Sequence, residues 1–79
     1  MIAKPRPRGH QRLYDLLSQQ SHAHVFDVYE AVRGRPYFGK DAAKCMKNIS
    51  SVVTRFNRAE TTCMVVPGPE VYTYRLHRC

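Results

Sequence analysis

The stretch KDAAKCMKNISSVVTRFNR, from Lys40 to Arg58, decides how this chain folds. Its apolar residues recur at steps of three or four, which is the spacing that places side chains along one face of an α-helix. This apolar stripe consists of Ala42, Cys45, Met46, Ile49, Val52, Val53 and Phe56. Asp41 stands at the N-cap position, where its negative charge also suits the helix dipole. The pattern predicts one helix over residues 40–58, of about five turns, with one face buried.

The opposite face of this predicted helix is cationic and polar. It carries Lys40, Lys44, Lys47, Arg55 and Arg58, with Asn48, Ser50, Ser51 and Thr54 among them. A hydrated helix face ordinarily mixes acids with bases, because like charges three or four residues apart weaken a helix slightly. The scarcity of acids therefore favours contact with an anionic polymer over the alternative of a simply hydrated surface.

The formal net charge of +7 is unevenly distributed along the 79 residues. Residues 1–12 hold four basic residues and no acid, residues 40–58 hold five against one, and the remainder is nearly balanced. Clustered positive charge is the electrostatic pattern expected of a nucleic-acid-binding protein, whereas scattered charge would serve solubility equally well.

Length and composition predict one small domain. No stretch approaches the roughly 20 apolar residues of a membrane span, and no apolar run follows the basic N-terminus as it would in a secretory signal. The three cysteines have neither a disulfide nor a zinc spacing, so Cys45 and Cys63 are expected to be small core residues. These features predict a cytoplasmic, nucleoid-associated protein that makes no membrane contact.

Residues 1–9, MIAKPRPRG, interleave prolines with basic residues. Proline at this density disfavours helix and favours extended backbone, which predicts a flexible basic arm. Arg6 and Arg8 would then lie along phosphates or in a minor groove, as the arginine-bearing arms of other DNA-binding proteins do. A plain disordered terminus is the alternative.

Residues 10–39 are predicted to form two helices and their connections. The first helix covers residues 10–20, and a short extended piece follows over residues 21–25. The second helix covers residues 26–34, with Gly34 as its C-cap. Tyr37 and Phe38, in the loop over residues 35–39, are expected to pack on the core. His22 and His24 lie two residues apart without a third ligand nearby, so no metal site is predicted.

After the long helix the apolar period changes to two. TTCMVV, residues 61–66, and VYTYRL, residues 71–76, predict the two strands of a β-hairpin. Pro67 and Gly68 suit a tight type II turn between them. In the second strand Tyr72, Tyr74 and Leu76 point to one face, which is expected to be the core.

This fold class, α+β with three helices followed by a C-terminal β-hairpin, resembles the winged helix-turn-helix DNA-binding domain over residues 10–78. The resemblance implies that residues 10–79 form a single winged-helix-like domain whose long helix enters the major groove while the hairpin, or wing, lies against the flanking backbone. It implies base contacts by Asn48, Ser50, Ser51, Thr54 and Arg55, and phosphate contacts by Lys40, Lys44, Lys47 and Arg58. Arg75 and Arg78 would contact the backbone from the wing. The predicted wing tip, PGPE, departs from the pattern because it carries an acid and no base.

The leading functional prediction is a sequence-specific double-stranded DNA-binding protein, a transcriptional regulator or recombination accessory factor. Its size resembles the stand-alone regulators of bacteriophages and mobile elements, and a homodimer would read two half-sites. Two alternatives stay open. One is a protein-interaction module, which an acidic wing tip suits. The other is an RNA-binding or single-strand-binding protein with Tyr37, Tyr72 or Tyr74 as stacking platforms. The scattered acids and the absence of a phosphate-binding loop or catalytic set predict a protein that is not an enzyme and uses no cofactor.

Overall fold

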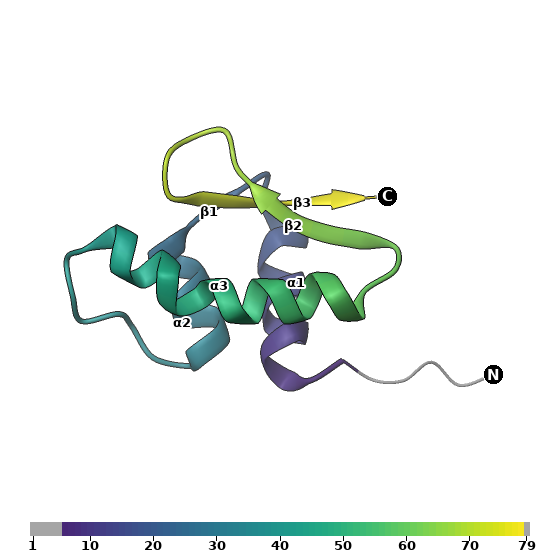
Figure 1. Cartoon of the computed structure of the whole chain (residues 1–79), viewed down its shortest axis with the longest axis horizontal. Helices are drawn as coiled ribbons and strands as arrows, with labels where there is room; N and C mark the ends of the chain where they lie inside the picture. Colours follow the sequence, from purple (N-terminus) through teal and green to yellow (C-terminus); the bar gives the residue numbers. More distant parts are fainter. Residues whose placement is uncertain (1–5, 79) are drawn as a thin grey trace.

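The computed structural model describes residues 6–78. The elements follow in the order α1 (Arg8–Gln19), β1 (Ala23–His24), α2 (Val25–Arg33), α3 (Ala42–Ala59), β2 (Cys63–Pro67) and β3 (Thr73–Arg78). The predicted fold class, three helices followed by a C-terminal β-hairpin, is confirmed. Figure 1 shows α3 crossing in front of α1 and α2, with the sheet above the helices.

The sheet has three antiparallel strands in the order β1-β3-β2. In the hairpin, Val65 lies opposite Leu76, and at the far edge of β3 Ala23 of β1 lies opposite Tyr74. Of the extended piece predicted over residues 21–25, Ala23–His24 form this third strand, and Val25 already begins α2.

The core lies between the three helices and one face of the sheet. Helix α1 packs on α2, α2 packs on α3, and the sheet closes the core through β2 on α3 and β3 on α1. The predicted stripe of α3 supplies the largest share: Cys45, Ile49, Val52, Val53 and Phe56 are buried, and Ala42 and Met46 are partly buried. Leu13 and Leu17 of α1 and Val25, Val28 and Tyr29 of α2 complete the helical part.

Helix α1 begins at Arg8, two residues before the predicted start. Pro7 is the N-cap, and its carbonyl accepts from the backbone N–H of Gln11 at 2.9 Å. The first N–H groups of a helix have no acceptor within the helix, so a proline, which lacks an N–H, loses nothing at this position. A helix can therefore start directly after it. The predicted flexible arm is thus too long by at least Arg8 and Gly9, and residues 1–5 lie outside the described residues.

The loop that joins β2 to β3, called the wing loop below, does not form the type II turn predicted at Pro67 and Gly68. The chain turns later, where the N–H of Thr73 bonds to the carbonyl of Glu70 at 3.3 Å, and Tyr72 takes the left-handed conformation with φ 59°. Gly68 serves close approach instead, because a Cβ there would lie 2.4 Å from the Thr73 hydroxyl oxygen. As a result β3 covers Thr73–Arg78, not residues 71–76.

Of the two aromatic residues in the loop between α2 and α3, one packs as predicted. Tyr37 stacks on Phe26 with centroids 5.5 Å apart and meets Tyr29 edge-on at 5.1 Å. The prediction for Phe38 was wrong, because its side chain is 88% exposed. The Tyr37 ring fills the space against Phe26 and Tyr29, and Phe38 is left in solvent.

Candidate nucleic-acid interface

The candidate interface is built on α3, whose start is set by its cap. Asp41 Oδ1 accepts from the N–H groups of Ala43 at 3.0 Å and Lys44 at 3.2 Å, as predicted for an N-cap. Because the buried stripe then fixes the rotation of the helix about its axis, the residues between the stripe positions must face outward. Lys40 directly precedes the N-cap residue, so it lies outside α3 but next to its first turn.

We call the outward side of α3, together with Lys40, the basic face. All nine residues predicted for it are exposed: Lys40, Lys44, Lys47, Asn48, Ser50, Ser51, Thr54, Arg55 and Arg58. Within residues 6–78 the ion pairs are Arg6 with Glu60 and His22 with Glu70. The five cations of the basic face therefore have no acidic partner in the described part of the chain. Their charge is left free to act on a ligand.

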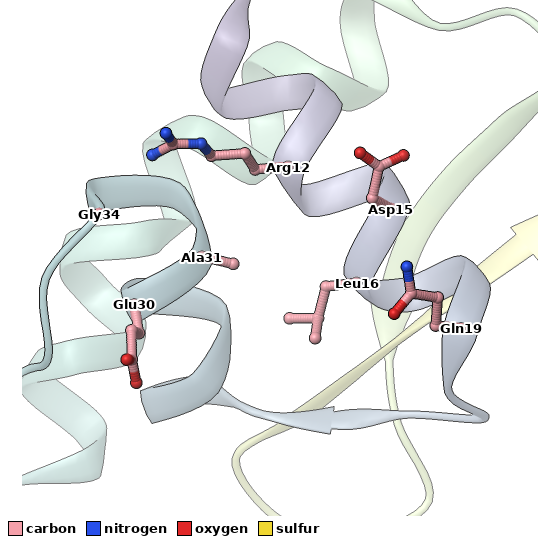
Figure 2. A pocket seen from close by; sticks show the side chains of 7 residues that line it. All are labelled: Arg12, Asp15, Leu16, Gln19, Glu30, Ala31 and Gly34. Carbon is pink, nitrogen blue, oxygen red and sulfur yellow. The ribbon is translucent and has the colours of Figure 1, made fainter.

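Two acidic residues gather on another part of the surface. An open pocket of about 490 Å³ lies between α1 and α2. Figure 2 shows Asp15 on its α1 side and Glu30 on its α2 side. Arg12 reaches in from the α1 wall, and Leu16 lies at its apolar centre. None of the lining residues comes from α3. These acids are therefore placed where they do not neutralise the basic face.

Arg33, which was not among the residues predicted from the sequence, contacts the basic face. Arg33, in the last turn of α2, donates from Nη2 to Oδ1 of Asn48 at 3.1 Å. The contact holds the carbonyl oxygen of Asn48 and leaves its amide nitrogen available as a donor. No local pattern pairs residues 15 positions apart, and the only signal was a basic residue at the end of a helix.

Asn57 is a second residue that sequence reasoning missed, and it joins α3 to the wing. Its side-chain nitrogen donates to the carbonyl of Val65 at 2.9 Å, and its side-chain oxygen accepts from the Val65 N–H at 2.7 Å. Since β2 is an edge strand, this Asn57 clamp occupies backbone groups that another strand would otherwise use. The clamp also fixes the position of the wing relative to the basic face.

The arginines predicted outside α3 are not gathered on the basic face. Arg75 lies on the sheet face away from the helices, because Tyr74 and Leu76 on either side of it point to the core. Arg78 is exposed at the end of β3, opposite Cys63. Arg8 is exposed at the start of α1.

Arg6 is bound within the fold, which corrects its predicted place in a free arm. Its guanidinium pairs with the carboxylate of Glu60 and lies 4.0 Å from the centroid of the Tyr14 ring. The hydrogen bond that Arg6 Nε donates to the Glu60 carboxylate raises the pKa of Arg6 above its ordinary value. Glu60 and Tyr14 therefore hold Arg6 against the folded domain, and its contact with phosphate stays a prediction.

The remaining polar groups near the wing serve local structure. His24 caps α2 by accepting from the Phe26 N–H at 3.1 Å, and His22 Nδ1 lies 3.0 Å from the Ser21 hydroxyl. Among residues 6–78 no three His, Cys, Asp or Glu side chains are grouped so that they could hold a metal ion. Within the same range, no helix has the length and apolar character needed to cross a bilayer.

Comparisons with known proteins add no assignment: no protein-family model, curated protein or solved structure matches this chain. The interface therefore rests on its geometry and charge alone.

Proposed function

We propose that this chain is a sequence-specific double-stranded DNA-binding protein of the winged helix-turn-helix type, acting as a transcriptional regulator or recombination accessory factor. One observation carries the proposal: the basic face, formed by the exposed side of α3 together with Lys40, presents five cations interleaved with short hydrogen-bonding side chains, and no acid in residues 6–78 pairs with them. A single α-helix with this surface fits the major groove of B-DNA, which is about 12 Å wide.

The basic face divides into two kinds of residue by chemistry. Lys40, Lys44, Lys47 and Arg58 are suited to phosphates, which position a protein without distinguishing sequences. Arg55 can pair in a bidentate way with guanine, and the free amide nitrogen of Asn48 can donate to a base edge. Oδ1 of Asn48 has a second lone pair, so it could accept from adenine while it keeps the bond from Arg33.

The placement of the three tyrosines counts against their use as stacking platforms for single strands. Tyr74 is buried, and Tyr37 and Tyr72 are partly buried against the core. Proteins that bind single strands without sequence preference stack successive bases on exposed aromatic faces. These three rings do not form such a platform.

Fluorescence anisotropy of labelled duplex DNA, single-stranded DNA and RNA at 50–200 mM salt tests the proposal. If each of the five cations neutralises one phosphate, the slope of log K against log salt is about −4.5, a loss of about 500-fold over this range. We expect tighter binding to duplex than to either single strand. Salt-sensitive binding to single strands alone, or no binding at 50 mM salt, would refute it.

A matched pair of substitutions locates the interface. Lys44→Gln removes one charge from the basic face, and Arg12→Gln removes one charge from the pocket between α1 and α2. Only Lys44→Gln should weaken all duplexes alike and reduce the salt slope by about 0.9. Arg55→Ala should instead reduce the preference for the cognate site over random duplex, and an equal loss on both would contradict its base-reading role.

A further inference from the structure

The loop between α2 and α3 projects one large apolar side chain into solvent. Phe38 is 88% exposed, while its neighbour Tyr37 is packed between Phe26 and Tyr29. Full burial of a Phe side chain is worth about 1.5–3 kcal/mol, and in the free protein this gain is not realised. The side chain therefore contributes nothing visible to the stability of the fold.

The backbone on both sides of Phe38 is held in place. Before it, the Tyr37 ring is anchored by two aromatic contacts. After it, Gly39 lies so close to that ring that a Cβ would be 2.8 Å from Tyr37 Cε1. Asp41 then fixes the start of α3 through its two capping hydrogen bonds. Phe38 thus projects from a supported position next to the first turn of the basic face.

The surroundings of Phe38 are cationic. Arg35 and Lys40 are exposed on either side of it in the loop, and Lys44 follows in the first turn of α3. The one acid nearby, Asp41, is engaged as the helix cap. An aromatic ring flanked by cations is complementary to a nucleobase flanked by phosphates. It is a poor match for an apolar protein surface, against which the three charges would lose their hydration.

We propose that Phe38 inserts as a wedge at a base step of the bound duplex, a role that rests on the proposed DNA-binding function and extends it. Apolar side chains of this kind partly unstack the step and bend the duplex. Unstacking is easiest at TA and CA steps, so the cognate site should carry such a step at the position that Phe38 reaches. The domain would then select sequence by deformability as well as through α3.

The test compares Phe38→Ala with Val71→Ala, a control that removes another exposed apolar side chain, 76% exposed on the wing loop. Both variants should keep the wild-type melting temperature. Phe38→Ala should bind a selected duplex about tenfold more weakly with an unchanged salt slope, because stacking releases no counterions. Val71→Ala should weaken binding much less than Phe38→Ala, because an aliphatic side chain on the hairpin loop can touch the DNA backbone but cannot stack on a base.

Direct readouts of unstacking accompany the affinities. 2-Aminopurine, placed in turn at each adenine of the selected duplex, should brighten at one step with the wild type and not with Phe38→Ala. Energy transfer between labelled duplex ends should report a bend that Phe38→Ala reduces.

Three results separate this inference from the function on which it rests. Salt-sensitive duplex binding that Lys44→Gln weakens and Phe38→Ala leaves unchanged overturns the wedge alone. Absence of duplex binding by the wild type overturns both. A wild-type dimer in sedimentation that Phe38→Ala converts to monomer identifies a second copy as the partner of Phe38 and also overturns the wedge.

Discussion

Substitution of Asn57 by alanine removes the clamp between α3 and β2. The two hydrogen bonds to the backbone of Val65, at 2.9 and 2.7 Å, are lost. Val65 is only 3% exposed, and its backbone N–H and carbonyl are left without a partner. A hydrogen bond contributes about 1 kcal/mol net, and an unsatisfied partner raises the cost, so we expect a loss of about 2–3 kcal/mol. A domain of this size has about 4–12 kcal/mol in total.

The corresponding fall in melting temperature is about 12–18 °C, since the unfolding entropy of a domain this small gives about 6 °C per kcal/mol. Thermal and urea denaturation followed by circular dichroism measure it. Asn48→Ala is the control on the same helix: its amide makes one exposed contact, with Arg33, so it should cost less than about 0.5 kcal/mol.

Asn57→Asp adds a sharper test of the donor half of the clamp. The carboxylate keeps the acceptor for the Val65 N–H but faces the Val65 carbonyl, 2.9 Å from the present nitrogen, without a proton to donate. The protonated form restores that donor, so the pKa of the new carboxyl would be raised in the folded state. The protonated carboxyl therefore makes the folded state of Asn57→Asp more stable than that of Asn57→Ala below about pH 4, and this difference is lost as the pH rises. A melting temperature of Asn57→Ala within about 3 °C of wild type would refute the clamp.

Three further predictions concern the core, the backbone and the buried thiols. Phe56→Ala should cost about 3–5 kcal/mol, because Phe56 is 0% exposed, and urea denaturation should show a midpoint lowered in proportion. Gly34→Ala should destabilise the fold by about 1 kcal/mol, because Gly34 has φ 76° and an added Cβ would meet Arg12. Gly9→Ala, within α1, should instead stabilise it by about 0.5–1 kcal/mol. Melting temperatures that shift in the same direction in both variants would contradict this pair of predictions. Burial raises the pKa of the Cys45 and Cys63 thiols above 9.0, so both should react slowly with thiol reagents at pH 8 in the folded protein. The free energy of unfolding should fall as the pH rises above about 9, because the unfolded chain loses these protons more readily. Rapid labelling without urea would count against the burial of the two thiols.

The sequence predicted well the features that repeat along one element. The spacing of apolar residues in α3 fixed both its buried stripe and, by exclusion, its basic face, and Asp41 marked its start. Alternation in the hairpin likewise predicted that Tyr74 faces the core. Each of these features follows from the period of a helix or a strand, which a single sequence displays directly.

Features that depend on contacts between elements were missed. Nothing near Asn57 indicates that its amide reaches β2, and nothing near Arg6 indicates its pairing with Glu60. The turn in the wing was misplaced because Gly68 is needed for space beside Thr73, not for its torsion angle. Packing decides such details, and the local pattern is compatible with more than one outcome.

The pairing of β1 with β3 has a consequence for the order in which the protein folds. Asn57 and Val65 are eight positions apart, and the hairpin strands are neighbours in the chain, so α3 and the wing can form a unit from local contacts. Ala23 reaches Tyr74 only after the chain closes a loop that contains α2, α3 and β2, and loop closure costs entropy before the contact forms. The packing of α1 on α2 is also local in the chain, so we expect both halves to gain structure before β1 pairs with β3, and that pairing to join them as the slower step.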